Sequence, residues 1–156
     1  MIFVECDNDE ALLRGLGIPK ARFDHHASKP RVAKALQKAA ANSGAIGLVD
    51  QDPHAGPPPY LKEFVEVENA AGLGLRRLKH RKDNKWLVEI QPDLEPWLYT
   101  TAKLADISPS TSHLPENYNV LHDHPKAHAK HLRDFVAGLL RRGNPRMTKL
   151  AEWLKN

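Results

Sequence analysis

Two aspartates directly after a short apolar run are the residues whose type and spacing first point to chemistry. The stretch LVDQDPHAG (48–56) places Asp50 and Asp52 two residues apart, with Gly56 to help the chain bend. Glu5 follows a similar apolar run, MIFV, at the N-terminus. If both runs are parallel strands, the three carboxylates meet at one sheet edge, where ligands bind in such folds. Clustered carboxylates repel one another, and a hard cation such as Mg²⁺ relieves that repulsion. The alternative is a polar turn in which Asp50 caps a helix.

The elements around these acids must form a parallel sheet if the acids are to meet. Apolar runs alternate with segments of helical periodicity and good caps, which is typical of strand–helix–strand units with a parallel sheet. The expected order is a strand, a helix, a short strand, a helix and a buried strand, over 1–5, 8–17, 21–23, 28–44 and 45–50. The sequence therefore predicts the α/β class, with a mostly parallel sheet flanked by helices.

The rest of the chain extends this domain without starting a second one. Segments 73–80 and 85–90 are predicted as strands on either side of a basic loop, and 94–105 as a helix. A long polar, proline-rich loop covers 106–125, and loops of that length are often functional. Segment 126–156 is predicted to form a helical C-terminal extension packed on the domain. A length of 156 residues fits one domain over 1–156.

Composition excludes several classes of protein. The single cysteine, Cys6, forms no internal disulfide, and it favours a reducing compartment. The acidic N-terminus is unlike a signal peptide, and no apolar run is long enough to span a membrane. We therefore expect a cytoplasmic protein with no membrane partner.

Two segments resemble motifs of the Toprim domain superfamily, which serves topoisomerases, primases, OLD-family nucleases and small stand-alone proteins. The matching pieces are IFVECDNDEALLRGLG and AIGLVDQDPHAG, in the order that the family shows. They cover about the first third of the chain. Cys6 stands where the family usually has glycine after the first glutamate.

The resemblance implies a Toprim-like (Rossmannoid) fold and Mg²⁺- or Mn²⁺-dependent phosphodiester chemistry on nucleic acid, DNA or RNA. Glu5 would act as general acid/base or metal ligand, and Asp50 and Asp52 as metal ligands. Asp9 would be a further metal-site acid, although a helix N-terminal charge explains it equally well. Related proteins place another acid after a later strand, for which Glu95 is the first candidate and Asp93 the second.

Basic residues near the middle of the chain are candidates for holding a nucleic-acid backbone. The stretch RRLKHRKDNK (76–85) has six basic residues against one acid. His54 lies close enough in sequence to Asp52 to reach a phosphate. A solvated hairpin and a surface histidine are the alternatives. The candidate contacts are Arg76, Arg77, Lys79, Arg81, Lys82 and His54.

Other motifs favour less specific interpretations. Asp24-His25-His26 is the signature string of DHH phosphoesterases, but the further Asp and His motifs of that family do not precede it. His124 and His128 have the spacing of a zinc pair, yet Pro125 predicts that His124 lies outside the helix. Cys6 has no partner histidine identifiable by spacing.

Two functions follow as hypotheses. The first is a Toprim-type nuclease with Mg²⁺ or Mn²⁺ at the acidic edge. The second is a non-catalytic Toprim-like module that binds nucleic acid or protein, together with a partner that supplies ATPase or targeting activity.

Overall fold

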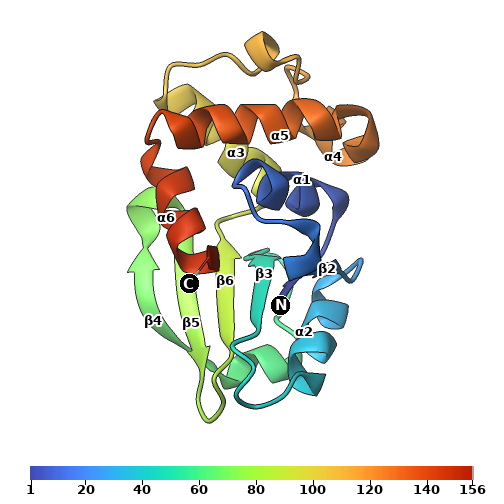
Figure 1. Cartoon of the computed structure of the whole chain (residues 1–156), viewed down its shortest axis with the longest axis vertical. Helices are drawn as coiled ribbons and strands as arrows, with labels where there is room; N and C mark the ends of the chain where they lie inside the picture. Colours follow the sequence, from blue (N-terminus) through green and yellow to red (C-terminus); the bar gives the residue numbers. More distant parts are fainter. Residues whose placement is uncertain (156) are drawn as a thin grey trace.

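A six-stranded mixed sheet forms the centre of the computed structural model, which describes residues 1–155 (Figure 1). The strand order is β2-β1-β3-β6-β5-β4. The first four strands in this order run parallel, and β5 and β4 add an antiparallel pair at one side. The strands are β1 (Ile2–Val4), β2 (Phe23–His25), β3 (Ile46–Asp50), β4 (Phe64–Ala70), β5 (Leu75–His80) and β6 (Trp86–Ile90).

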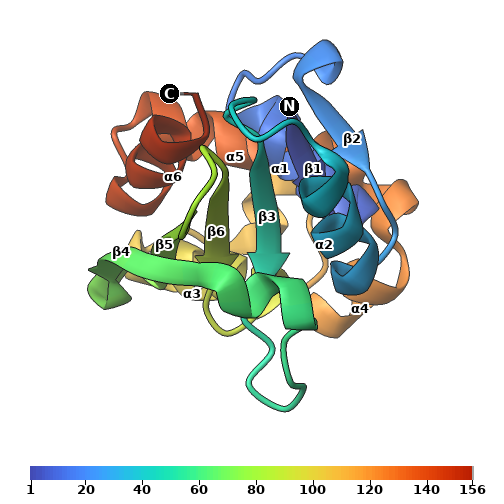
Figure 2. The same ribbon diagram turned by 90° about the horizontal axis from the view of Figure 1, so that it is seen from below.

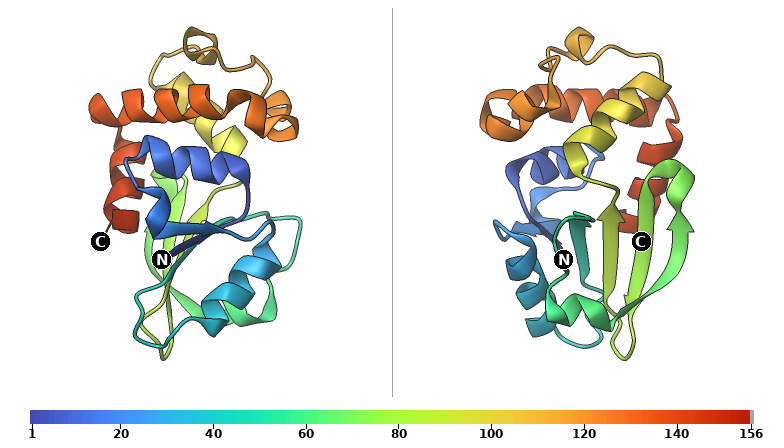
Figure 3. Two further views of the ribbon diagram at one scale, coloured as in Figure 1. Left: turned by 45° about the vertical axis from the view of Figure 1, so that its right-hand side comes forward. Right: turned by 180° about the vertical axis from the view of Figure 1, so that it is seen from behind.

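Six α-helices accompany the sheet within residues 1–155. The long helix α5 lies across α1 at the top of Figure 1. Helix α6 lies in front of β5 and β6 in that view and behind them after a half turn (Figure 3). The helices are α1 (Asp7–Gly15), α2 (Lys29–Lys38), α3 (Leu94–Leu104), α4 (Tyr118–Asp123), α5 (Pro125–Arg141) and α6 (Pro145–Lys155).

Strand β3 is buried on both faces, because its side chains contribute to two hydrophobic clusters. Ile46 and Leu48 belong to the cluster that includes residues of α1, α3, α5 and α6. Val49 belongs to the cluster that includes residues of α2 and the 3-10 helix Pro59–Glu63. Apolar residues on both faces are what a central parallel strand requires. The expected α/β class is therefore confirmed, with a sheet that is mixed and has four parallel strands.

Three local predictions differ from the structure. The second strand is Phe23–His25 and follows a 3-10 turn, Lys20–Arg22, which displaces it from the predicted 21–23. Strand β4 was not predicted, because at the sheet edge Val65 and Val67 are exposed and alternate with glutamates. The polar segment 106–125 contains a 3-10 turn and α4, so it is only partly a loop.

No helix within residues 1–155 combines the length and the apolar character needed to cross a membrane.

Gly15 allows α1 and α5 to approach each other closely. A Cβ atom at this position would lie 2.6 Å from Val136 Cβ and 2.7 Å from the carbonyl oxygen of Arg133. We therefore expect Gly15→Ala to lower the free energy of unfolding by about 1–3 kcal/mol, as overpacking does. Gly138→Ala is the matched control, because its nearest neighbour would be the tip of Arg141 at 3.9 Å. It should raise stability by about 0.5–1 kcal/mol. Equal effects of the two substitutions in urea unfolding would contradict this account.

Candidate metal centre

The carboxyl ends of β1, β3 and β6 meet at one edge of the sheet and enclose an acidic cavity. In the parallel register Val4 lies beside Leu48, so the residues that follow β1 lie next to the end of β3. The cavity has a volume of about 430 Å³. Five carboxylates and one lysine line it: Glu5, Asp50, Asp52, Asp93, Glu95 and Lys29.

Glu5 lies directly beside Asp50, although 45 residues separate them in the sequence. The backbone N–H of Asp50 donates a 2.9 Å hydrogen bond to Glu5 Oε2. Burial raises the pKa of Glu5, and the nearby charges of Asp52 and Asp93 act in the same direction. The hydrogen bond from Asp50 and the charge of Lys29 lower this pKa but do not outweigh burial. The structure thus brings together the two strand-end acids that the sequence singled out.

Asp50 is fixed by the start of α3. Its Oδ1 atom accepts a 3.0 Å hydrogen bond from the backbone N–H of Leu94. Burial, followed by the negative charges of Asp9 and Glu5, raises the pKa of Asp50 to about 9. A carboxyl group with such a high pKa lacks a nearby positive charge that would stabilise its ionised form. A bound cation would supply that charge.

Asp52 lines the cavity from a left-handed backbone conformation. Its φ is 46°, a region that aspartate tolerates better than most residues. Its N–H donates to the carbonyl oxygen of Pro92 at 3.1 Å, which ties the exit of β3 to the exit of β6. The chain turns directly after Asp52, where the N–H of Ala55 donates to the carbonyl oxygen of Asp52 at 3.2 Å, and Gly56 follows this turn without a positive φ. Figure 2 shows the 51–58 loop standing out from the rest of the chain.

Asp9 lies behind the cavity and does not line it. It is buried, and its Oδ2 accepts hydrogen bonds from the backbone N–H groups of Glu5 and Cys6, both at 3.0 Å. Burial and the charge of Glu5 raise its pKa to about 7. These contacts match the role of a helix N-terminal acid, and they also fix the backbone of Glu5.

The two acids considered after the last parallel strand both reach the cavity. Glu95 is buried, and its Oε1 accepts a hydrogen bond from Asn8 Nδ2 at 3.0 Å. Asp93 is more exposed, and partial burial together with Asp52 and Glu95 raises its pKa. Both acids line the cavity, so the first candidate, Glu95, and the second candidate, Asp93, are both part of it.

Sequence reasoning missed Lys29 and one wall of the cavity. Lys29 Nζ donates to the carbonyl oxygens of Asp50 and Gln51, at 2.7 and 3.0 Å. Helix α4 contributes Tyr118, Asn119 and His122, and His122 Nδ1 lies 3.3 Å from Glu95 Oε1. The one available signal was that the 106–125 segment is long, which is common for functional segments. Cys6 has no catalytic environment, since burial and Asp9 raise its pKa.

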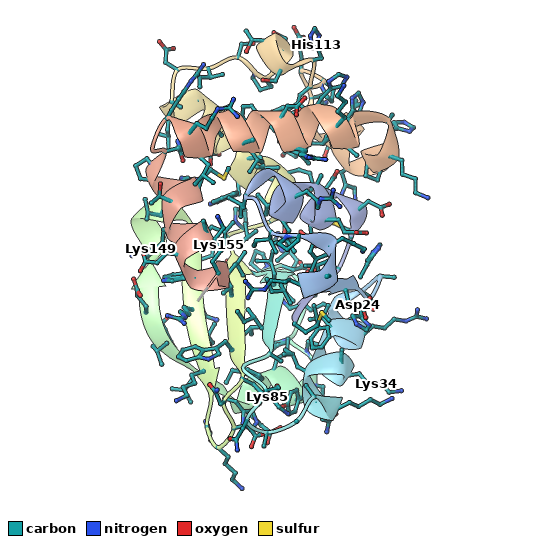
Figure 4. The ribbon with its side chains drawn as sticks, in the orientation of Figure 1. Asp24, Lys34, Lys85, His113, Lys149 and Lys155 are labelled. Atoms are coloured by element: carbon teal, nitrogen blue, oxygen red, sulfur yellow. The ribbon has the colours of Figure 1, made fainter. Side chains whose placement is uncertain are left out.

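The predicted nucleic-acid contacts lie apart from this cavity or are already paired. Arg76 forms an ion pair with Glu89 at 2.8 Å, and Arg77 stacks on Trp86 with a 4.0 Å separation. Lys79 lies above the same indole ring at 5.4 Å. Strand β6 separates the β5–β6 turn from the cavity edge by about 13 Å, because its five residues span four steps of about 3.3 Å. Arg81 and Lys82 lie in the turn that joins β5 to β6. Lys85 follows this turn, and Figure 4 labels it near the lower end of the molecule.

His54 lies in the exposed loop after Asp52. It is near enough to Asp93 for its charge to lower the pKa of that acid. His124 immediately precedes α5, outside its helical residues as Pro125 predicted. Within residues 1–155, neither His124 nor His128 belongs to a group of three metal-ligating side chains.

Comparison of this chain with protein-family models, with curated proteins and with solved structures gave no match. The geometry of the site is therefore the basis for any statement about function.

Proposed function

We propose that this chain is a Mg²⁺- or Mn²⁺-dependent phosphodiester hydrolase acting on nucleic acid, with a Toprim-like arrangement of acids. The observation that carries the proposal is the convergence of five carboxylates on one cavity that a single lysine also lines. Oxygen ligands suit a hard divalent cation, and burial among other acids raises the pKa of Glu5 and Asp50, so these carboxyls ionise unfavourably without a positive charge nearby. The residue types therefore fit such an ion. Within residues 1–155 no three cavity acids have ligand atoms within 4.8 Å of one another, so their side chains must close around it.

Glu5, Asp50 and Asp52 are the residues that would hold the cation. When bound, the ion would supply charge stabilisation for a phosphoryl group and a more acidic water molecule. The backbone holds these acids in place before any substrate arrives, because Glu5 and Asp50 each accept a hydrogen bond from a main-chain N–H. These hydrogen bonds limit how far Glu5 and Asp50 must move to share one ion, although their ligand atoms and that of Asp52 do not all lie within 4.8 Å of one another.

Lys29 supports a phosphate substrate in this proposal. Two main-chain carbonyls hold its ammonium group at the cavity wall. From there it can attract a phosphate oxygen, which five carboxylates alone would repel. His122 of α4 adds a polar group to the lining, next to Glu95.

A cleavage assay tests the proposal. Plasmid DNA, single-stranded DNA and structured RNA are incubated with the protein in Mg²⁺, Mn²⁺ or EDTA. We expect cleavage of at least one substrate with metal and none in EDTA. Glu5→Gln, which keeps an acceptor for the Asp50 N–H, should lower the rate by at least about 100-fold. Glu152→Gln is the matched control, because this residue is exposed and pairs only with Lys149 among the described residues.

Two results would overturn the hydrolase proposal. One is full activity in Glu5→Gln, which would place the chemistry elsewhere. The other is salt-sensitive binding of nucleic acid without turnover on any substrate, which would identify the chain as a binding module.

A further inference from the structure

We propose a second metal site outside the acidic cavity, formed by Asp7, Glu10 and His25 and suited to one Zn²⁺-class ion. Each residue offers a ligand atom, and the three atoms lie within 4.8 Å of one another. His25 Nδ1 is 3.3 Å from Glu10 Oε2 and 3.6 Å from Asp7 Oδ1. Within residues 1–155 this is the only such group of three.

Two elements that the sheet holds side by side position these ligands. Asp7 and Glu10 are three residues apart in the first turn of α1, so their side chains share one face of the helix. His25 ends β2, and the parallel register places it beside Val4, just before the chain enters α1. The site therefore depends on the same strand end that presents Glu5 to the cavity.

A hydrogen bond outside the group fixes which nitrogen of His25 is free. His25 Nε2 lies 2.9 Å from the main-chain carbonyl oxygen of Glu5. A carbonyl oxygen only accepts, so Nε2 carries the proton and donates it. In the neutral ring Nδ1 then has a lone pair, and it faces two carboxylates. Three acceptors facing each other are stabilised by positive charge between them, which either a proton on Nδ1 or a metal ion that replaces it supplies. Metal-binding histidines characteristically donate their other N–H to a carbonyl or carboxylate in this way.

Two of the three distances between ligand atoms match tetrahedral coordination, and the third, between Asp7 and Glu10, is below 4.8 Å. Zn–N and Zn–O bonds of about 2.0–2.2 Å in a tetrahedron place neighbouring ligand atoms about 3.3–3.6 Å apart. The two distances from His25 Nδ1 have these values. The three side chains are between 26% and 33% exposed, so solvent can reach the site and water can complete the coordination. One imidazole and two carboxylates favour Zn²⁺ over Mg²⁺, which prefers oxygen ligands alone.

A neighbouring lysine competes for part of the site without closing it. Lys20 Nζ forms an ion pair with Glu10 Oε1 at 2.6 Å, and the Lys20 side chain is 55% exposed. The pair uses Oε1, and Oε2 remains directed at His25. Asp24, in the same Asp-His-His string, pairs with His26 at 3.2 Å and takes no part.

Zn²⁺ titration of the full chain by isothermal calorimetry tests this site, with excess Mg²⁺ present to occupy the acidic cavity. We expect one equivalent of Zn²⁺ to bind the wild type, Asp50→Asn and Asp24→Asn. Asp7→Asn and His25→Ala should each weaken this binding by at least about 10-fold. Asp7→Asn preserves the side-chain shape, and thermal melts check that both variants fold. Unchanged binding in Asp7→Asn and His25→Ala, or no binding to the wild type, overturns the proposal.

Two further measurements separate this site from the acidic cavity. Loss of Zn²⁺ binding in Asp50→Asn would place the ion in the cavity and overturn the second site, whatever the nuclease assay gives. Nitrogen NMR of the His25 ring should show Zn²⁺ shifting Nδ1 while Nε2 keeps its proton. Coordination through Nε2 would contradict the tautomer on which the site depends.

Discussion

Asp50→Asn is expected to abolish metal-dependent cleavage and, in the metal-free protein, to increase stability. The two effects have one cause, which is that Asp50 places a carboxyl group in a buried acidic cluster. Burial and the neighbouring acids Asp9 and Glu5 raise the pKa of Asp50 to about 9, so without a cation this carboxyl must take up a proton when the chain folds. Asparagine is neutral and folds without that proton uptake, and it retains an oxygen to accept the hydrogen bond from the Leu94 N–H.

The expected size is a loss of at least about 100-fold in kcat/KM, as for removal of one charge-stabilising group. In EDTA at pH 8 the free energy of unfolding should rise by about 1–3 kcal/mol. Cleavage kinetics and urea unfolding on the same preparation measure both. Asp134→Asn, an exposed acid on α5, is the control and should change neither. Loss of activity accompanied by loss of stability would show that Asp50 supports the fold instead of the proposed chemistry.

The edge where the acids meet was predictable from the sequence, because one rule of parallel sheets determines it. Buried runs followed by Glu5 and Asp50 placed both residues at strand ends, and adjacent parallel strands have their carboxyl ends at the same edge. Glu95 and Asp93 follow the next parallel strand for the same reason. The chemical role of these residues does not follow from this rule, and the metal-dependent cleavage assay tests it.

Residues that reach the cavity only through tertiary packing could not be predicted in this way. Lys29 begins a helix after an edge strand, and its contacts with the carbonyl groups of Asp50 and Gln51 follow only from how α2 packs. His122 lies on a short helix within a polar segment, where periodicity gives little signal. Composition also overstated the basic hairpin. Two of the basic residues counted there already have partners. Arg76 forms ion pairs with Glu89 and Glu66, and Arg77 stacks on Trp86.

The stability of the metal-free protein is expected to fall as the pH rises from about 5 to about 9. The folded state raises the pKa of Asp50 to about 9 and that of Asp9 to about 7, both from 3.8. A group whose pKa is raised by folding binds its proton more tightly in the folded chain than in the unfolded one. Its stabilising contribution is complete below about pH 4 and is lost as the pH passes through the folded-state values. Over this range we expect a loss of several kcal/mol, measured by urea unfolding in EDTA.

Mg²⁺ should reverse this loss, because a cation bound to the folded cavity stabilises the ionised carboxylates. The rise in melting temperature on adding Mg²⁺ should therefore be large at pH 8 and small at pH 5, where protons occupy the same groups. Asp50→Asn should show a shallower fall with pH and little response to Mg²⁺, whereas Asp134→Asn should behave as the wild type does. Stability that stays constant or increases from pH 5 to pH 9 in EDTA would mean that the acidic cavity is already compensated within the protein. In that case its carboxylates would have no need of a metal, and the proposed hydrolase site would lose its physical basis.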